Sequence, residues 1–540
     1  MFKMRKIIFI LLAFLIVSCS TKERVDLIVT NANIYTVDED FKTAEAFTVT
    51  NGKFVAVGST SEINQNYQSA TIIDADGKTI VPGLIDAHCH FLRLGESVQA
   101  VDLVNTKSFD EVVKRVVDFQ NKKNLKFITG VGWDQNDWEV KEYPNKKLLD
   151  QLFPNTPIAL TRVDGHAIFC NQAALDLGNV TVNSKIDGGE VVLKDGELTG
   201  VLIDNAESLV MNYWPKITRE DKVNALLAAQ EICFDMGLTT VDDAGLSIDD
   251  IEIIDSLQNT GALNMRIYAM VSATKQNLDY YLNKGIVKTK KLNVRSFKYY
   301  ADGALGSRGA MLRTEYSDQP GHLGLMVNTL EDFQTTAERI AKSNYQMNTH
   351  AIGDSANRSV LQTYHKLLKD TPGRRWRVEH AQVLAPEDFD YYKDIVPSIQ
   401  PTHATSDMYW AEERIGSVRV KGAYAFKDLL KKHGKVALGT DFPVEHVSPF
   451  YTFYAAVSRQ DLEQYPKGGF QPENALTREE ALRGMTVWAA YSNFEENEKG
   501  SIEVGKFGDF IVLDKDIMKV PIEETPHIRA LHTFVDGEEQ

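Results

Sequence analysis

The chain is poor in cysteine, with four in 540 residues. Once Cys19 near the N-terminus is set aside, three cysteines remain: Cys89, Cys170 and Cys233. So few cysteines, and an odd number of them, do not indicate a disulfide framework. We expect these three to be small buried apolar residues. The chain also lacks a basic block, and its formal net charge is −16. This balance argues against nucleic acid as a partner, although a pocket can differ in charge from the whole chain.

The N-terminus lacks an apolar run long enough to span a membrane. Lys3, Arg5 and Lys6 precede the apolar segment Ile7–Val17, which is typical of a signal peptide. The segment ends in Ile-Val-Ser-Cys19, which resembles a bacterial lipobox, while an ordinary secretory signal is the alternative. We therefore expect a lipoprotein signal peptide over residues 1–18, lipidation of Cys19 and a tether over 19–24. The protein would be exported and lipid-anchored in a bacterial cell envelope, with the outer membrane favoured because serine follows the cysteine.

Both ends of the remaining chain are typical of β-structure. Short apolar runs follow one another from Val25, and Asn51-Gly52 is a hairpin signal. The same pattern of short apolar runs occurs near the C-terminus, between Gly505 and Asp514 and again from Ile528 to Val535. We therefore predict one composite β-sandwich domain built from residues 25–82 and 500–540.

The middle of the chain alternates apolar strand candidates with amphipathic helix candidates, the pattern of an α/β protein. The strand candidates are eight, the number that a (β/α)8 TIM barrel requires: Leu84–His90, Leu238–Asp243, Met265–Val271, Ser296–Ala301, Gln346–His350, Arg375–His380, Ile395–Gln400 and Val436–Thr440. We therefore predict a barrel over residues 83–499. The first gap between strands is too long for one connection and carries its own strand and helix signals, so residues 105–205 are predicted to form an inserted subdomain.

The first barrel strand ends in His88-Cys89-His90. Side chains alternate along a strand, so the two imidazoles share one face and Cys89 lies on the other. Two such imidazoles can hold one metal ion. A histidine pair alone leaves a structural role open.

Further ligand-type residues follow other predicted strands. Lys298 lies on the fourth, His350 and His380 end the fifth and sixth, and Asp441 follows the eighth. Functional residues of barrel enzymes lie at these C-terminal strand ends. Each residue alone has an alternative: a structural histidine, a helix cap for Asp441, or an ion pair of Lys298 with Asp302 or Asp243.

Together these residues resemble the amidohydrolase superfamily, and within it the amidohydrolase-3 branch of YtcJ-like and N-substituted formamide deformylase-like proteins. The resemblance spans nearly the whole mature chain. Its motifs are Gly130-Val-Gly-Trp-Asp134, Arg162-Val-Asp-Gly-His166, Asp302-Gly-Ala-Leu-Gly-Ser-Arg308, Val378-Glu-His-Ala381 and Gly439-Thr-Asp-Phe-Pro443.

The resemblance implies a metal-dependent hydrolase with one or two divalent ions, zinc being expected. His88, His90 and Asp441 would bind one ion, and His350 and His380 the other. Lys298, carboxylated by CO₂, would bridge them, since a plain ammonium group would repel a cation. A metal-activated hydroxide would attack the substrate carbon, with Asp441 as general base and then acid. Lys298 and His380 complete the expected catalytic set.

Trp133, His166, Arg308 and His403 are the candidates for substrate contact. Trp133 could equally be a core residue, and His166 could equally be structural. Arg308 could hold a carboxylate or an oxyanion. His403 could orient the substrate carbonyl.

The expected reaction is hydrolysis of a non-peptide C–N bond of a small amide or formamide. Deamination or opening of a cyclic amide at the same site is a second possibility, and a non-catalytic small-molecule-binding lipoprotein is a third. The expected partners are the small substrate and, through the lipid, a membrane; a homodimer stays open.

Overall fold

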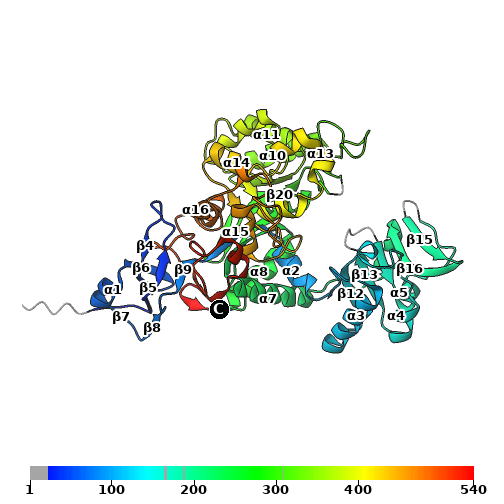
Figure 1. Cartoon of the computed structure of the whole chain (residues 1–540), viewed down its shortest axis with the longest axis horizontal. Coiled ribbons are helices and arrows are strands. Elements are labelled where there is room, and N and C mark those ends of the chain that lie inside the picture. Colours follow the sequence, from blue (N-terminus) through cyan, green and yellow to red (C-terminus); the bar gives the residue numbers. More distant parts are fainter. Residues whose placement is uncertain (1–21, 163–166, 187–188, 307) are drawn as a thin grey trace, which may run out of the picture.

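The structure is a computed structural model that describes residues 22–162, 167–186, 189–306 and 308–540. Its centre is a barrel of eight parallel strands in chain order (Figure 1). These strands are β10 (Leu84–Cys89), β17 (Leu238–Leu246), β18 (Arg266–Ser272), β20 (Leu292–Tyr300), β21 (Gln346–Ala351), β22 (Arg377–His380), β23 (Val396–Ile399) and β24 (Ala437–Leu438). The short strand β19 (Val287–Lys288) pairs with β20. All eight predicted strands are present, and the predicted TIM-barrel fold is confirmed.

The last strand meets the first through the segment that follows β24. Asp441 N–H donates to His88 O, and His90 N–H donates to Phe442 O, each at 2.8 Å. A Cβ at Gly439 would lie 2.5 Å from His88 N, so only glycine allows this close approach. The backbone contacts that bring the two ends of the sheet together therefore lie at the ligand residues themselves.

Helices surround the barrel, and several of them begin with side chains that satisfy free amide groups. Thr218 and Asp221 form a capping box for one helix, and Ser247 and Asp250 form one for the next. The main surrounding helices are α2 (Phe91–Ser97), α7 (Arg219–Asp235), α8 (Ile248–Thr260), α9 (Lys275–Lys284), α10 (Leu330–Ala341), α11 (Asp354–Leu368), α12 (Pro401–Asp407), α13 (Ala411–Arg419), α14 (Phe426–His433), α15 (Pro449–Ser458), α16 (Arg478–Gly484) and α17 (Val487–Ser492).

Two sheets lie at one end of the molecule, the first built from N-terminal strands and the second from strands of both chain termini. The four-stranded sheet has the order β6 (Lys53–Gly58), β5 (Ala46–Thr50), β2 (Leu27–Thr30) and β8 (Thr71–Asp74). The six-stranded sheet has the order β27 (Glu538–Glu539), β26 (Ala530–Val535), β25 (Phe510–Leu513), β9 (Thr79–Pro82), β3 (Asn33–Tyr35) and β4 (Thr43–Ala44). Phe47 of the first sheet packs edge-on against Phe510 of the second, with ring centroids 4.8 Å apart.

A buried ion-pair cluster joins this end of the molecule to the barrel. Arg266, the first residue of β18, donates to both carboxylate oxygens of Asp509, at 2.6 and 2.9 Å. It also donates to Asp536 at 2.6 Å, and its guanidinium lies 4.0 Å from the Phe507 ring centroid. One arginine therefore connects the barrel to the C-terminal strands.

A second unit lies beside the barrel (Figure 1). Its sheet has the order β11 (Val101–Asp102), β12 (Ile128–Trp133), β13 (Ile158–Arg162), β14 (Ala167–Cys170), β16 (Glu197–Asp204) and β15 (Gly189–Lys194), and its helices include α3 (Phe109–Lys123), α4 (Lys147–Leu152), α5 (Gln172–Leu177) and α6 (Ser208–Met211). It has apolar clusters of its own. We refer to residues 101–211 as the inserted subdomain. The limits predicted from the sequence, for this subdomain and for the other domains, stay predictions.

Cys89, Cys170 and Cys233 are free and buried, as predicted. Cys89 packs in the core behind the barrel wall, on the opposite face from the histidines that flank it. No helix within the described residues is long and apolar enough to cross a membrane. The predicted signal peptide and Cys19 lie outside the described residues.

Candidate metal centre

The two histidines at the end of β10 each have one ring nitrogen fixed by the protein. His88 Nδ1 lies 2.5 Å from Glu379 Oε2, and His90 Nδ1 lies 2.9 Å from the Ala244 carbonyl oxygen. Both partners only accept hydrogen bonds, so each Nδ1 must carry the proton. The lone pair of each neutral imidazole then lies on Nε2, which faces the barrel mouth.

Both Nε2 atoms approach the same oxygen. Asp441 Oδ1 lies 3.6 Å from His88 Nε2 and 3.3 Å from His90 Nε2, and it is buried without a hydrogen-bond partner among the described residues. Two lone pairs and a carboxylate oxygen that face one another repel unless a cation lies between them. Metal bonds of about 2.0–2.2 Å can join donors at such separations. These residues therefore fit a divalent metal ion.

His350 and His380 add two further imidazoles to the cluster. The ring centroids of His350 and His380 are 4.5 Å apart, and those of His88 and His380 are 4.9 Å apart. His350 Nε2 and His380 Nδ1 are buried and lack hydrogen-bond partners among the described residues, although Asp302 Oδ1 approaches His350 Nε2 to 3.6 Å. Among the described residues, one group of three such side chains, His88, His380 and Asp441, has donor atoms that all lie within 4.8 Å of one another. This group mixes ligands that the resemblance assigns to two different ions.

Two of the donors reach the cluster through left-handed backbone. His380 has φ of +71° and Asp441 has φ of +66°. Such conformations are costly for residues other than glycine and concentrate at functional sites. At His380 the chain leaves the regular alternation of β22, in which Arg377 and Glu379 share the inner face.

Lys298 lies within the same cluster, fully inside the barrel. Its Nζ is 3.0 Å from His88 Nε2 and 5.1 Å from the ring centroid of Tyr300. The alternative ion pairs are not formed, because Asp243 accepts the backbone N–H groups of Phe91 and Leu92. Asp302 likewise accepts backbone N–H groups, from residues 311, 352 and 353.

The charge state of these groups suits metal binding. Burial lowers the pKa of His88 to about 4 and that of His350 to about 3, so both imidazoles are neutral near pH 7. Burial also lowers the pKa of Lys298 to about 8. Burial acts against ionisation of Asp441, but the hydrogen bond with His403 and the nearby histidines hold its pKa well below the usual range. Neutral imidazoles beside a carboxylate form a typical metal-binding donor set.

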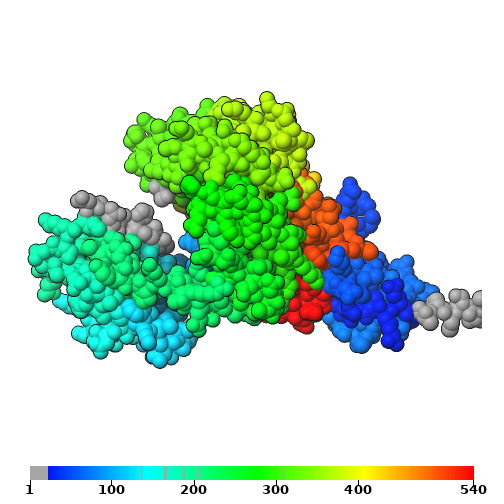
Figure 2. All heavy atoms as spheres, turned by 180° about the vertical axis from the view of Figure 1, so that it is seen from behind, coloured from blue at the N-terminus to red at the C-terminus, as the bar shows by residue number. Residues whose placement is uncertain are grey.

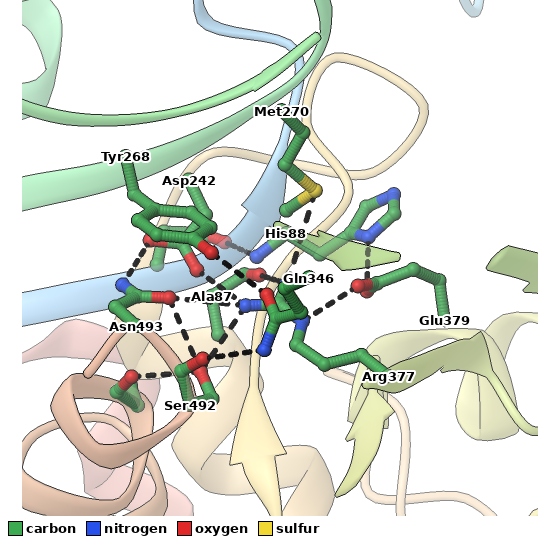
Figure 3. Close-up of polar contacts among 12 residues, drawn as sticks. Ala87, His88, Asp242, Tyr268, Met270, Gln346, Arg377, Glu379, Ser492 and Asn493 are labelled. Atoms are coloured by element: carbon green, nitrogen blue, oxygen red, sulfur yellow. Dashed lines mark hydrogen bonds and ion pairs between the residues drawn. The ribbon is translucent and has the colours of Figure 1, made fainter. Parts of the chain in front are cut away.

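A buried polar network supports His88 from beneath (Figure 3). Glu379, which accepts from His88, also accepts from Arg377 Nε at 2.7 Å. Arg377 Nη1 donates to Asp242 at 2.9 Å, and Asn493 donates to the other oxygen of Asp242 at 2.6 Å. Charges with no solvent contact require such mutual compensation. Glu379, Asp242 and Asn493 were not among the predicted site residues, although two charged residues on the inner face of β22 were a usable signal.

Asp86 ties the two ends of the site together. It accepts from His88 N–H at 3.1 Å, from Thr440 N–H at 3.1 Å and from the Thr440 hydroxyl at 2.7 Å. It therefore holds the segment of Asp441 against the strand of the two histidines. This residue was also missed.

His403 is bonded on both ring nitrogens. Its Nε2 lies 3.2 Å from Asp441 Oδ2, and its Nδ1 lies 3.1 Å from Glu445 Oε1. The two carboxylates raise the pKa of His403 well above its ordinary value, although burial opposes the rise. Glu445 also accepts from the Ser406 hydroxyl at 2.6 Å. His403 thus acts on Asp441 in this arrangement, and the sequence analysis had not linked it to Glu445.

The other candidates for substrate contact lie elsewhere. Trp133 is buried in the core of the inserted subdomain, and its indole N–H donates to Leu160 O at 2.7 Å, so the structure favours a packing role. Arg308 pairs with Asp318 at 2.7 Å. His166 lies outside the described residues.

A parallel barrel whose strand ends gather four imidazoles, a carboxylate and a lysine defines a class, the metal-dependent barrel hydrolases. A family model described as the amidohydrolase family matches residues 71–539. The chain therefore belongs to the amidohydrolase family and is a hydrolase that acts on carbon–nitrogen bonds, and the recognition of its amidohydrolase-3 branch is confirmed.

Relatives of known name agree with this assignment. The chain is 30% identical to the putative amidohydrolase YtcJ of Bacillus subtilis, over 94% of this chain and 97% of the relative. It is 25% identical to the N-substituted formamide deformylase of Arthrobacter pascens, over 95% and 97%. A crystal structure of an uncharacterised metal-dependent hydrolase from Pyrococcus horikoshii superposes with a TM-score of 0.77 at 28% identity, covering 92% of this chain and 99% of that one.

Proposed function

We propose that this chain hydrolyses the C–N bond of a small non-peptide amide, an N-substituted formamide or a close analogue. One observation carries the proposal: the lone pairs of His88 and His90 converge on the unpartnered oxygen of Asp441. The similarity to an N-substituted formamide deformylase supports the formamide class.

One or two zinc ions are the metals that we propose for the site. His88, His90 and Asp441 would hold one, and His350 and His380 would hold a second. Bound zinc polarises a carbonyl group and lowers the pKa of water. The uncharged fraction of Lys298 is enlarged by its lowered pKa, and we propose that this amine adds CO₂ and loses a proton, which gives a carbamate as a shared ligand.

The protein's own groups supply the proton transfers. Asp441 is ionised, and its Oδ1 faces the cluster while Oδ2 is held by His403. It can accept a proton from the attacking water and return it to the leaving nitrogen. Glu379 keeps the proton of His88 on Nδ1, so the lone pair that can bind the metal is on Nε2, the atom 3.0 Å from Lys298 Nζ.

Metal analysis and a substrate panel test the proposal. Protein prepared with zinc should contain about two ions per chain, and Lys298→Ala should lose at least one. Lys499→Met is a matched control, since Lys499 is equally buried but pairs with Glu495 at 2.7 Å, away from the cluster. Formamides, acylated amines and cyclic amides should then be compared for turnover. A folded protein that binds no zinc would contradict the proposal, and turnover of cyclic amides alone would replace it with ring opening.

We also propose that the protein is exported and anchored to the cell envelope by a lipid on Cys19. The support is the lipobox-like Ile16-Val-Ser-Cys19 after an apolar segment. Expression in a bacterial host with labelled fatty acid should label the wild type and leave Cys19→Ala unlabelled. An unlabelled wild type would contradict the anchor without affecting the proposed reaction.

A further inference from the structure

A cavity of about 1220 Å³ has one of the proposed metal ligands, His90, in its wall and extends to residues of the inserted subdomain. His90 and the end of β17 line it on the barrel side, and helix α2 contributes Arg93 and Glu96. The subdomain contributes Phe127, and the segment leading back into the barrel contributes Trp214. Figure 2 shows the molecule hollowed between the inserted subdomain and the barrel. The proposed reaction centre therefore opens into a space that is large enough for a substituted amide.

One wall of this cavity is apolar. The rings of Phe127 and Trp214 pack edge to face with centroids 5.3 Å apart, and the exposed Met211 lies beside them in the cavity lining. Aromatic and methionine side chains are suited to bind an apolar substituent. The subdomain side thus favours a substrate with a hydrophobic group.

Most of the carboxylates that line the cavity already have partners within the protein. Asp250 pairs with Lys222 at 2.5 Å, and Asp221 accepts from Thr218 as the cap of α7. Asp243 accepts two backbone N–H groups. Glu96 is then the one lining carboxylate among the described residues without a hydrogen bond or ion pair of its own.

Of the five lysines and arginines in the lining, only Lys222 has such a partner among the described residues. Arg93 and the lining lysines 123, 126 and 216 make no hydrogen bond or ion pair with the described residues, and all four are exposed. The whole lining holds five lysines and arginines and four carboxylates, a formal charge of +1 in a chain whose net charge is −16. Such local charge selects anionic ligands.

Among these cations, Arg93 lies nearest in sequence to the metal centre. It follows His90 by three residues and lines the same cavity. It lies in the first turn of α2, whose N-cap residue is the proposed ligand His90. An anion held by Arg93 would therefore lie beside an amide bound at the cluster.

We propose that the substrate is an amide that carries a carboxylate close to the scissile bond and an apolar substituent beyond it, and that Arg93 binds this carboxylate. The proposal rests on the proposed function and refines it, since an N-substituted formamide need not be charged. Water adds across the C–N bond, so an N-formyl amino acid would give formate and the free amino acid.

A matched pair of substrates tests this. N-formylphenylalanine and N-formylphenethylamine share the formamide and the phenyl group, and they differ only in the carboxylate. We expect the wild type to have at least a tenfold higher kcat/KM for the acid. Arg93→Gln should lower that preference about tenfold, mainly through KM, and Arg93→Lys should retain part of it. The control is Arg529→Gln, which removes an exposed arginine next to strand β26.

Binding measurements test the role of Arg93 independently of turnover. The acid 3-phenylpropanoate and the neutral 3-phenylpropanol are not hydrolysed, so calorimetric titration with both works even if neither formamide turns over. Selective binding of the acid that is lost in Arg93→Gln supports the inference, whether or not the proposed reaction holds. Equal binding of both ligands, or equal turnover of both formamides, overturns the inference and leaves the proposed hydrolysis standing on its own test.

Discussion

Glu379 should control the affinity of the metal centre although it is not expected to be a ligand. Its two oxygens have different partners: Oε1 accepts from Arg377 Nε at 2.7 Å and Oε2 accepts from His88 Nδ1 at 2.5 Å. In Glu379→Gln only one side-chain atom can still accept. The charged guanidinium should retain the amide oxygen, which turns the amide NH₂ toward His88 Nδ1. The imidazole proton must then move to Nε2, the atom that faces the cluster.

The size of the effect follows from this change of tautomer. Hydrogen-bond partners of metal-bound histidines typically contribute 10- to 100-fold to metal affinity. This range corresponds to about 1.4–2.8 kcal/mol. The His88 and Glu379 side chains are both fully buried, so water cannot replace the lost interaction. We therefore expect the zinc dissociation constant of Glu379→Gln to rise roughly 10- to 100-fold.

Competition with a chromophoric chelator measures this constant directly. Tyr268→Phe is the matched control, because it removes the 2.7 Å hydrogen bond from Tyr268 to Gln346 in the same buried network (Figure 3) without a contact to His88. Glu379→Asp keeps the charge and should restore part of the affinity. If Glu379→Gln is folded, as judged by thermal unfolding, and binds zinc within twofold of the wild type, this reasoning is refuted.

Two further predictions concern other contacts. Glu445→Gln should lower kcat at least tenfold with unchanged zinc content, because Glu445 orients His403 on Asp441; Ser406→Ala is the control, and equal kcat in the two variants would contradict the role. Arg266→Met should lower the free energy of unfolding in urea by about 3–5 kcal/mol, because it leaves the buried Asp509 carboxylate without its partner. A loss below about 1 kcal/mol, the size expected for a surface pair, would show that this ion pair is not structural.

The barrel could be predicted because its strands are short apolar runs with ligand-type residues at their C-terminal ends. Alternation placed His88 and His90 on one face, and Cys89 does pack behind the wall. His380 and Asp441 were predicted from their position at strand ends. Their left-handed backbone, which the structure shows at both, is a property of tertiary contacts and leaves no local pattern.

The residues that support the metal ligands were harder to predict, because their contacts also depend on tertiary structure. Asn493 contacts Asp242 from a segment near the far end of the chain, and no local pattern relates the two. Arg308 looked available because its charge stands in a glycine-rich loop, but Asp318 lies on the same loop and pairs with it. A tryptophan at position 133 suits a substrate pocket and an apolar core equally well. Only its packing against Phe169 and the neighbouring residues shows that it belongs to the core.

The pairing of strands from opposite chain ends bears on quality control during synthesis. Strand β9 is bordered by β3 on one edge and by β25 on the other. While the ribosome makes the barrel, β25 does not yet exist, so one backbone edge of the buried strand β9 stays unpaired. Unpaired edges recruit other chains and mark a protein as unfinished. A product that stops anywhere within the barrel would carry this exposed edge, and only a chain that extends through β25 can cover it.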